Sequence, residues 1–206
     1  GPKADLSIGW DYENVLYLEE AKKLAQESDA VILTVGLSGQ MGETEAGDRR
    51  RMELFPAQEK LISEILKVNR NCAVVVVAGS AVTMDNWLDD APAVLFACYP
   101  GEQGGNGLAD ILFGKENPAG RLPITFAKSA DQYPEDMYSL TDDIYYKEDV
   151  FVGYRYFGKF DKEVLFPFGH GLSYTSFEYS KMNLSVSEKG GKRIVKVRAD
   201  VKNSGK

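Results

Sequence analysis

The sequence predicts an α/β fold, with a mostly parallel sheet flanked by helices, followed by the first strands of a β-sandwich. Three observations indicate this fold. Short apolar runs alternate with amphipathic segments over the first 127 residues, which is typical of βαβ units. The runs are apolar throughout, as strands buried on both faces should be. Beyond residue 177, two segments of alternating polarity flank a Gly-Gly pair, which favours a β-hairpin.

Each element of the α/β part follows from its local sequence. The amphipathic segments repeat apolar residues at helical spacing, and Pro56 suits the first turn of one of them. The apolar runs are rich in β-branched residues, which favour strands. In chain order we expect a helix in 17–30, a strand at 30–36, a helix in 55–70, a strand at 72–80, one helical turn at 85–90, a strand at 91–101, a helix within 101–118 that ends near Gly114, and a fourth strand at 120–126.

Polar and glycine-rich loops follow the first three predicted strands. They begin at residues 36, 79 and 99, and the first of them is dense in acidic and basic residues. Ligands of open parallel sheets bind beyond the carboxyl ends of the strands. The three loops should therefore line one edge of the sheet together.

Composition excludes several classes of function. The chain has 206 residues and a net charge of −7, and no cluster of basic residues suggests a nucleic acid as partner. No apolar run approaches the ~20 residues of a membrane helix. Cys72 and Cys98 adjoin apolar runs and are expected to be buried rather than bonded in a disulfide framework. A single histidine, His170, excludes a multi-histidine metal site within the chain.

The sequence divides into three predicted regions. Residues 1–127 form the α/β domain, residues 128–176 form an aromatic-rich irregular segment that packs on or between domains, and residues 177–206 form an incomplete β-sandwich. No helical period is visible in the middle region. Compartment and oligomeric state stay open, with a homo-oligomer as one option.

Three phrases resemble the C-terminal part of glycoside hydrolase family three, which includes β-glucosidases and β-xylosidases. They are "YPGEQGGNGLADILFGKENPAGRLPITF", "VGYRYF" and "LFPFGHGLSYTSFEYS", in this order. The resemblance implies an α/β sandwich domain followed by a fibronectin type III-like domain. It also implies a TIM-like barrel outside this chain, which carries an aspartate nucleophile, and no metal or organic cofactor.

The same resemblance implies site residues in the acidic loop. Many members place their acid/base glutamate three residues before an aspartate, and Glu45 has this offset from Asp48. Glu43 is the alternative acid/base residue. Ala46 and Gly47 depart from the usual glycine and aromatic residue at these two positions. Arg49 and Trp87 are the candidates for contact with the sugar, although loop fixation and core packing are the competing interpretations.

The function implied is that of a retaining exo-β-glycosidase acting on terminal β-glucosyl residues. Retaining enzymes of this kind use two carboxyl groups, one as nucleophile and one as acid/base. The alternatives are a non-catalytic carbohydrate-binding or scaffold domain, or β-xylosidase specificity. A nucleotide-binding protein is disfavoured, because the glycine spacing after the third strand matches neither common phosphate-binding motif.

Overall fold

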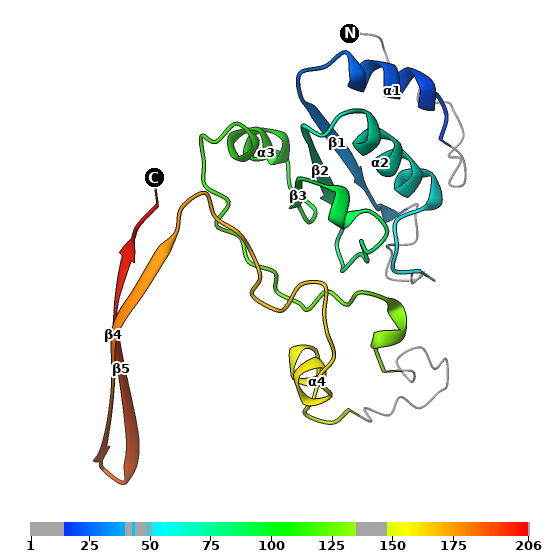
Figure 1. Ribbon diagram of the computed structural model, residues 1–206. Coiled ribbons are helices and arrows are strands. Elements are labelled where there is room, and N and C mark those ends of the chain that lie inside the picture. Colours follow the sequence, from blue (N-terminus) through cyan, green and yellow to red (C-terminus); the bar gives the residue numbers. More distant parts are fainter. Residues whose placement is uncertain (1–14, 40–42, 44–48, 50, 135–147, 206) are drawn as a thin grey trace. The chain divides into compact units, whose positions relative to one another are not determined.

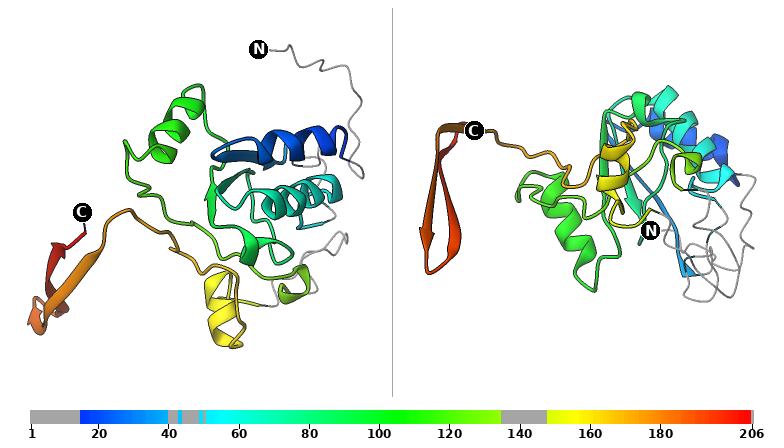
Figure 2. Two further views of the ribbon diagram at one scale, coloured as in Figure 1. Left: turned by 45° about the horizontal axis from the view of Figure 1, so that its top comes forward. Right: turned by 90° about the horizontal axis from the view of Figure 1, so that it is seen from below.

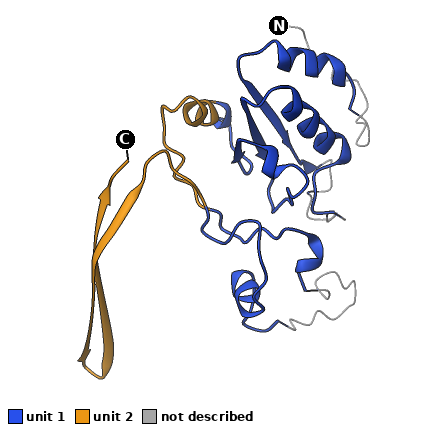
Figure 3. Ribbon diagram, viewed as in Figure 1, with its two compact units in different colours: residues 1–105, 122–170 blue, residues 106–121, 171–206 orange. Residues whose placement is uncertain are grey.

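The computed structural model describes residues 15–39, 43, 49, 51–134 and 148–205. By its contacts the chain divides into two units, residues 1–105 with 122–170, and residues 106–121 with 171–206 (Figure 3). The first unit contains the predicted sheet and the second contains the predicted hairpin. The domain boundaries expected after residues 127 and 176 stay a prediction.

A parallel sheet forms the centre of the first unit (Figure 1). Its order is β1-β2-β3, with β1 at Val31–Gly36, β2 at Cys72–Val77 and β3 at Ala93–Phe96. This sheet confirms the predicted α/β class. Because the strands are parallel, their carboxyl ends lie on the same edge of the sheet.

Two amphipathic helices lie side by side against this sheet, α1 (Leu18–Gln26) and α2 (Pro56–Val68) (Figure 2). Pro56 occupies the first turn of α2, as predicted. The buried side chains of α2 are Ile62, Ile65 and Leu66, so its apolar stripe faces the core. The turn predicted at 85–90 is a short 3₁₀ helix, Leu88–Asp90.

The core of the first unit joins the sheet to α2 and to a later segment. Val74, Val76 and Leu66 are buried in one cluster with Phe126. Phe126 packs edge to face on Phe96 with ring centroids 5.1 Å apart. The chain after residue 122 therefore returns to the same core as the sheet.

The fourth strand predicted at 120–126 is wrong. This segment instead pairs with residues 165–170 at two points, where the Leu122 amide donates to the His170 carbonyl and the Phe126 amide donates to the Phe166 carbonyl, both at 2.8 Å. Alternate residues of an antiparallel strand face the partner, so the missing N–H of Pro123 faces away from residues 165–170 and disfavours pairing with a further strand on that side.

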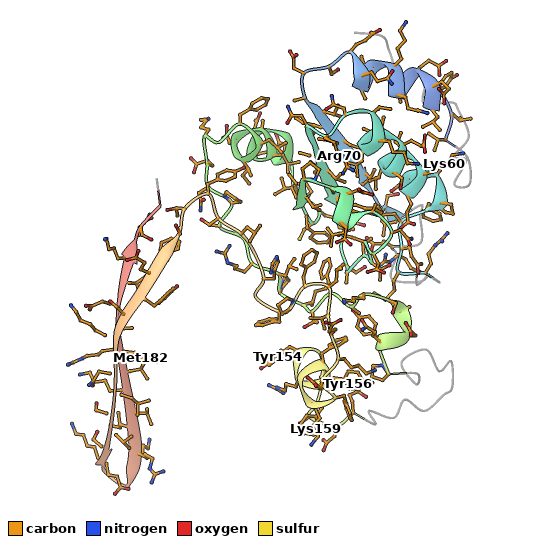
Figure 4. All side chains as sticks on the ribbon, viewed as in Figure 1. Lys60, Arg70, Tyr154, Tyr156, Lys159 and Met182 are labelled. Carbon is orange, nitrogen blue, oxygen red and sulfur yellow. The ribbon has the colours of Figure 1, made fainter. Side chains whose placement is uncertain are left out.

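The aromatic-rich region contains a helix that the sequence did not predict, α4 (Tyr154–Lys159). Figure 4 labels Tyr154, Tyr156 and Lys159 on it. The helix has six residues, which is too short for an apolar period to appear in the sequence. Its Tyr156 ring packs on Phe160 with centroids 4.9 Å apart.

The second unit contains α3 (Gly104–Leu112), most of which belongs to it, and an antiparallel hairpin of β4 (Phe177–Lys189) and β5 (Lys192–Asn203). Gly190 and Gly191 connect the strands with φ values of 59° and 72°. A type I′ turn requires positive φ at both central residues, which explains the glycine pair. The hairpin is confirmed, and its membership in a β-sandwich stays a prediction.

The two cysteines differ in their burial. Cys72 is buried as predicted, but Cys98 is exposed, so the second prediction is wrong. The reason is that β3 ends at Phe96 and Cys98 already has a left-handed backbone, with φ of 49°. Among the described residues, no helix is long and apolar enough to span a bilayer.

Candidate active site

Side chains from the three predicted loops meet at the carboxyl edge of the sheet. Glu43 follows β1, Ser80 follows β2 and Tyr99 follows β3. The Glu43 carboxylate accepts hydrogen bonds from both of the other side chains. The prediction that the loops line one edge together is confirmed for these residues.

Glu43 is the centre of this cluster. Its Oε1 accepts from the Ser80 hydroxyl at 2.6 Å and lies 3.3 Å from Arg49 Nε. Its Oε2 accepts from the Gly79 backbone N–H at 2.9 Å and from the Tyr99 hydroxyl. The side chain is only 7% exposed. Each carboxylate oxygen therefore faces two donors, which satisfies a group that would otherwise be costly to bury.

Arg49 follows residues 44–48 in the sequence and carries the positive charge that pairs with the Glu43 carboxylate. Its Nη2 donates to the Ser80 hydroxyl and to the Ala81 carbonyl, both at 2.7 Å. Ser80 thus accepts from Arg49 while it donates to Glu43. The Arg49 side chain is 12% exposed. Among the described residues, its Nη1 has no hydrogen-bond partner.

Two backbone features bring Tyr99 to Glu43. The left-handed conformation of Cys98 turns the chain immediately before Tyr99. Gly79 then leaves space for the ring, because a Cβ at this position would lie 2.5 Å from Tyr99 Cε2. A side chain at residue 79 is therefore incompatible with the present position of the tyrosine ring.

The carboxyl end of β1 is fastened by Gln58 of α2. The Gly36 N–H donates to Gln58 Oε1 at 3.1 Å, and Gln58 Nε2 donates to the Gly36 carbonyl at 2.8 Å. Within the described sheet β1 is an edge strand, so these backbone groups have no neighbouring strand. Gln58 fixes the point from which the acidic loop departs.

The cluster shifts the pKa values of its members. Burial raises the pKa of the Glu43 carboxyl, but hydrogen bonds from Ser80, Tyr99 and the Gly79 amide, with the Arg49 charge, lower it more, so the net pKa lies below 4.5. Burial and the hydrogen bond to Glu43 raise the pKa of Tyr99. At neutral pH Glu43 is a carboxylate that accepts, and Tyr99 is a phenol that donates.

Trp87 and Glu45 are the remaining site residues that the sequence predicts. Trp87 is 1% exposed and belongs to the core, so no face of its indole is available for a sugar. Glu45 and Asp48 lie outside the described residues. Ser80 and Tyr99 were not singled out from the sequence, although their positions directly after β2 and β3 were the available signal.

Within the described part of the chain, no group of three or more histidine, cysteine, aspartate or glutamate side chains could hold a metal ion.

Comparison with known proteins identifies the family. Residues 13–174 match the glycosyl hydrolase family 3 C-terminal domain, which is well over half of the 206 residues. The chain belongs to glycoside hydrolase family 3. It is 44% identical over 172 residues to a probable β-glucosidase I of Aspergillus flavus, covering 82% of this chain and 20% of that protein. It is 41% identical over 190 residues to a putative β-glucosidase of Schizosaccharomyces pombe, covering 91% and 22%.

Solved family 3 structures share the fold. The β-glucosidase of Bifidobacterium adolescentis superposes with a TM-score of 0.85 at 33% identity, covering 91% of this chain and 28% of that one. The Kluyveromyces marxianus β-glucosidase in complex with glucose gives a TM-score of 0.81 at 36% identity, covering 91% and 22%. This family 3 chain therefore spans about a fifth of the length of the curated relatives it matches.

Proposed function

We propose that this chain is the C-terminal α/β part of a retaining exo-β-glucosidase and supplies its acid/base residue, Glu45. The aspartate nucleophile would belong to a TIM-like barrel outside the chain. The family match over residues 13–174, with relatives named β-glucosidases, carries the proposal. The convergence of the three strand loops at one sheet edge supports it, because ligands bind at this edge in parallel sheets.

Glu45 would act twice in a double displacement. As a carboxylic acid it would protonate the glycosidic oxygen while the aspartate attacks the anomeric carbon, which releases the aglycone. As a carboxylate it would then remove a proton from water, which attacks the glycosyl-enzyme and releases glucose with retained configuration. No metal or organic cofactor takes part in these two steps.

The geometry of Glu43 favours Glu45 over its alternative. A general acid carries a proton at working pH and faces the leaving group. Both oxygens of Glu43 instead accept from protein donors, and its lowered pKa keeps the group ionised. Glu43 therefore has neither the proton nor a free oxygen that the first step requires.

Leaving-group dependence and azide rescue in the complete protein, barrel included, test the proposal. In Glu45→Ala, kcat/KM for a β-glucoside with a poor leaving group should fall by about 10²–10⁴-fold, the usual contribution of acid/base catalysis. A dinitrophenyl glucoside needs no protonation and should lose little in the first step. Azide should accelerate its turnover and form β-glucosyl azide.

Glu43→Ala, assayed in parallel, is the matched comparison. It should form no glucosyl azide, because its acid/base residue is still present. Rates unchanged in Glu45→Ala would contradict the enzymatic role of this residue and leave the scaffold interpretation. The same substrates in xyloside form separate β-xylosidase from β-glucosidase specificity.

A further inference from the structure

The acidic loop is anchored at both of its ends by one ion pair. Glu43 immediately precedes residues 44–48 and Arg49 immediately follows them. The Glu43 Oε1 and Arg49 Nε atoms lie 3.3 Å apart. The pair therefore brings the two ends of this segment together at a fixed separation.

Both anchors are also bound to the rest of the sheet edge. Ser80 bonds to Glu43 at 2.6 Å and to Arg49 at 2.7 Å, and the Ala81 carbonyl accepts from Arg49 at 2.7 Å. The Tyr99 hydroxyl donates to Glu43 and lies 3.3 Å from the Leu37 carbonyl, at the start of the same loop. The loop ends are thus tied to the chain after β1, β2 and β3.

Burial favours a single geometry of the Glu43–Arg49 ion pair. The two side chains are 7% and 12% exposed, so water screens their charges only weakly. Both Glu43 oxygens and the Arg49 Nη2 atom have hydrogen-bond partners, which favours one geometry of the pair, whereas removing either residue leaves an uncompensated buried charge. Ordinary exposed ion pairs of this chain, such as Arg51 with Glu53 at 3.7 Å, lack this property.

We propose that Glu43 and Arg49 form a charged clamp, locked by Ser80 and Tyr99, which positions the acid/base residue of the segment it encloses. Glu43 and Arg49 are positioning residues in this proposal, and the proposal's activity readout rests on the proposed function of Glu45. Catalytic groups must be held within about 0.5 Å of their productive place. A misplacement of about 1 Å can cost about 10²-fold in rate.

The first test measures mobility in the complete protein and does not depend on which residue is the acid. Hydrogen exchange of peptides spanning residues 43–49 should become at least about tenfold faster in Glu43→Gln and Arg49→Met, because either change breaks the clamp. Glu53→Gln removes the same charge from an exposed pair nearby and should leave this exchange unchanged. Equal exchange in all variants would overturn the clamp.

The second test measures positioning through catalysis. Glu43→Gln and Arg49→Met should each lower kcat/KM for a poor leaving group by about 10–100-fold, with less effect on a dinitrophenyl glucoside and no azide rescue. Arg49→Lys keeps the charge and should recover part of the loss. The double variant should be no slower than the slower single variant, because both residues act through one ion pair. Additive losses, or azide rescue in Glu43→Ala, would overturn the proposal.

Two controls separate the sources of failure. Tyr99→Phe takes the place of Glu43→Gln if that variant does not fold. It removes a single hydroxyl from the clamp and should accelerate hydrogen exchange and lower kcat/KM by smaller factors. If azide does not rescue Glu45→Ala but hydrogen exchange of residues 43–49 is faster in Glu43→Gln, the assignment of Glu45 as the acid/base residue is refuted and the clamp is retained. Azide rescue of Glu45→Ala, together with unchanged hydrogen exchange in Glu43→Gln, would refute the clamp alone.

Discussion

Replacing Gln58 by leucine should loosen the carboxyl end of β1 and with it the root of the acidic loop. The side-chain amide of Gln58 makes two hydrogen bonds to Gly36, at 3.1 Å and 2.8 Å. Leucine has a similar size but can neither accept from the Gly36 N–H nor donate to its carbonyl. The perturbation therefore removes polar contacts with little change in packing volume.

The expected loss of stability follows from these two contacts. Each hydrogen bond contributes about 0.5–1.5 kcal/mol net, and a partly buried backbone group left without a partner costs about 1–3 kcal/mol. Because Gly36 is only half-buried, water can reach part of it, and we expect Gln58→Leu to lower the free energy of unfolding by about 2–3 kcal/mol. Urea denaturation followed by circular dichroism measures this loss.

Gln58→Glu adds a pH dependence that leucine cannot produce. An ionised glutamate accepts from the Gly36 N–H but faces the Gly36 carbonyl with a second acceptor. A protonated glutamate can donate to that carbonyl, so folding raises the pKa of this carboxyl. Its stability should therefore be highest below about pH 4 and fall as the pH rises through the folded pKa.

Lys60→Met on the same helix is the control for both variants. Lys60 is exposed on α2 (Figure 4), and its substitution should change stability by less than about 0.5 kcal/mol. A Gln58→Leu variant as stable as the control would refute the proposed role of Gln58. A loss in Gln58→Glu that does not vary with pH would refute the hydrogen-bond reasoning.

Three further predictions concern the site and the core. Gly79→Ala should lower the free energy of unfolding by about 1–3 kcal/mol, because its Cβ would lie 2.5 Å from a ring atom of Tyr99. This loss should largely vanish in a Tyr99→Ala background, which a double-mutant cycle of unfolding free energies measures. Glu43→Gln should remove stability that is present above pH 4.5 and lost as the pH falls through the lowered pKa of Glu43. Glu59→Gln should instead remove a cost that grows as the pH rises through the raised pKa of the half-buried Glu59, so at pH 7 the first variant should be less stable than the parent protein and the second more stable; denaturation at pH 7 that shifts both variants in the same direction would contradict this. Trp87→Ala should cost about 3–5 kcal/mol by leaving a core cavity, and a raised KM at unchanged stability would instead show that the ring contacts substrate.

The sequence was sufficient for the elements that local chemistry determines. Apolar runs and Pro56 located the strands and the start of α2, and the glycine pair located the turn of the hairpin. Elements that depend on a distant partner were not predictable. Residues 120–126 have a strand-like pattern, but the backbone bonds of Leu122 and Phe126 to residues 165–170 decide their structure.

The same distinction between local sequence and distant partners holds for the site. Parallel strand order predicted that the three loops would meet, and resemblance pointed to the acidic loop. Neither could show that Glu43 is bonded on both oxygens, because those donors come from residues 36 to 56 positions away in the chain. The hydrogen bonds to both oxygens of Glu43 became visible only in three dimensions.

The most direct test of Glu45 as the acid/base residue is a crystal structure of the complete protein with a non-hydrolysable thio-β-glucoside bound. A Glu45 carboxyl oxygen should lie within about 3–3.5 Å of the glycosidic sulfur, with Glu43 still bonded to Ser80 and Arg49. A Glu43 carboxyl on the glycosidic sulfur, or both glutamates directed away from the sugar, would contradict it.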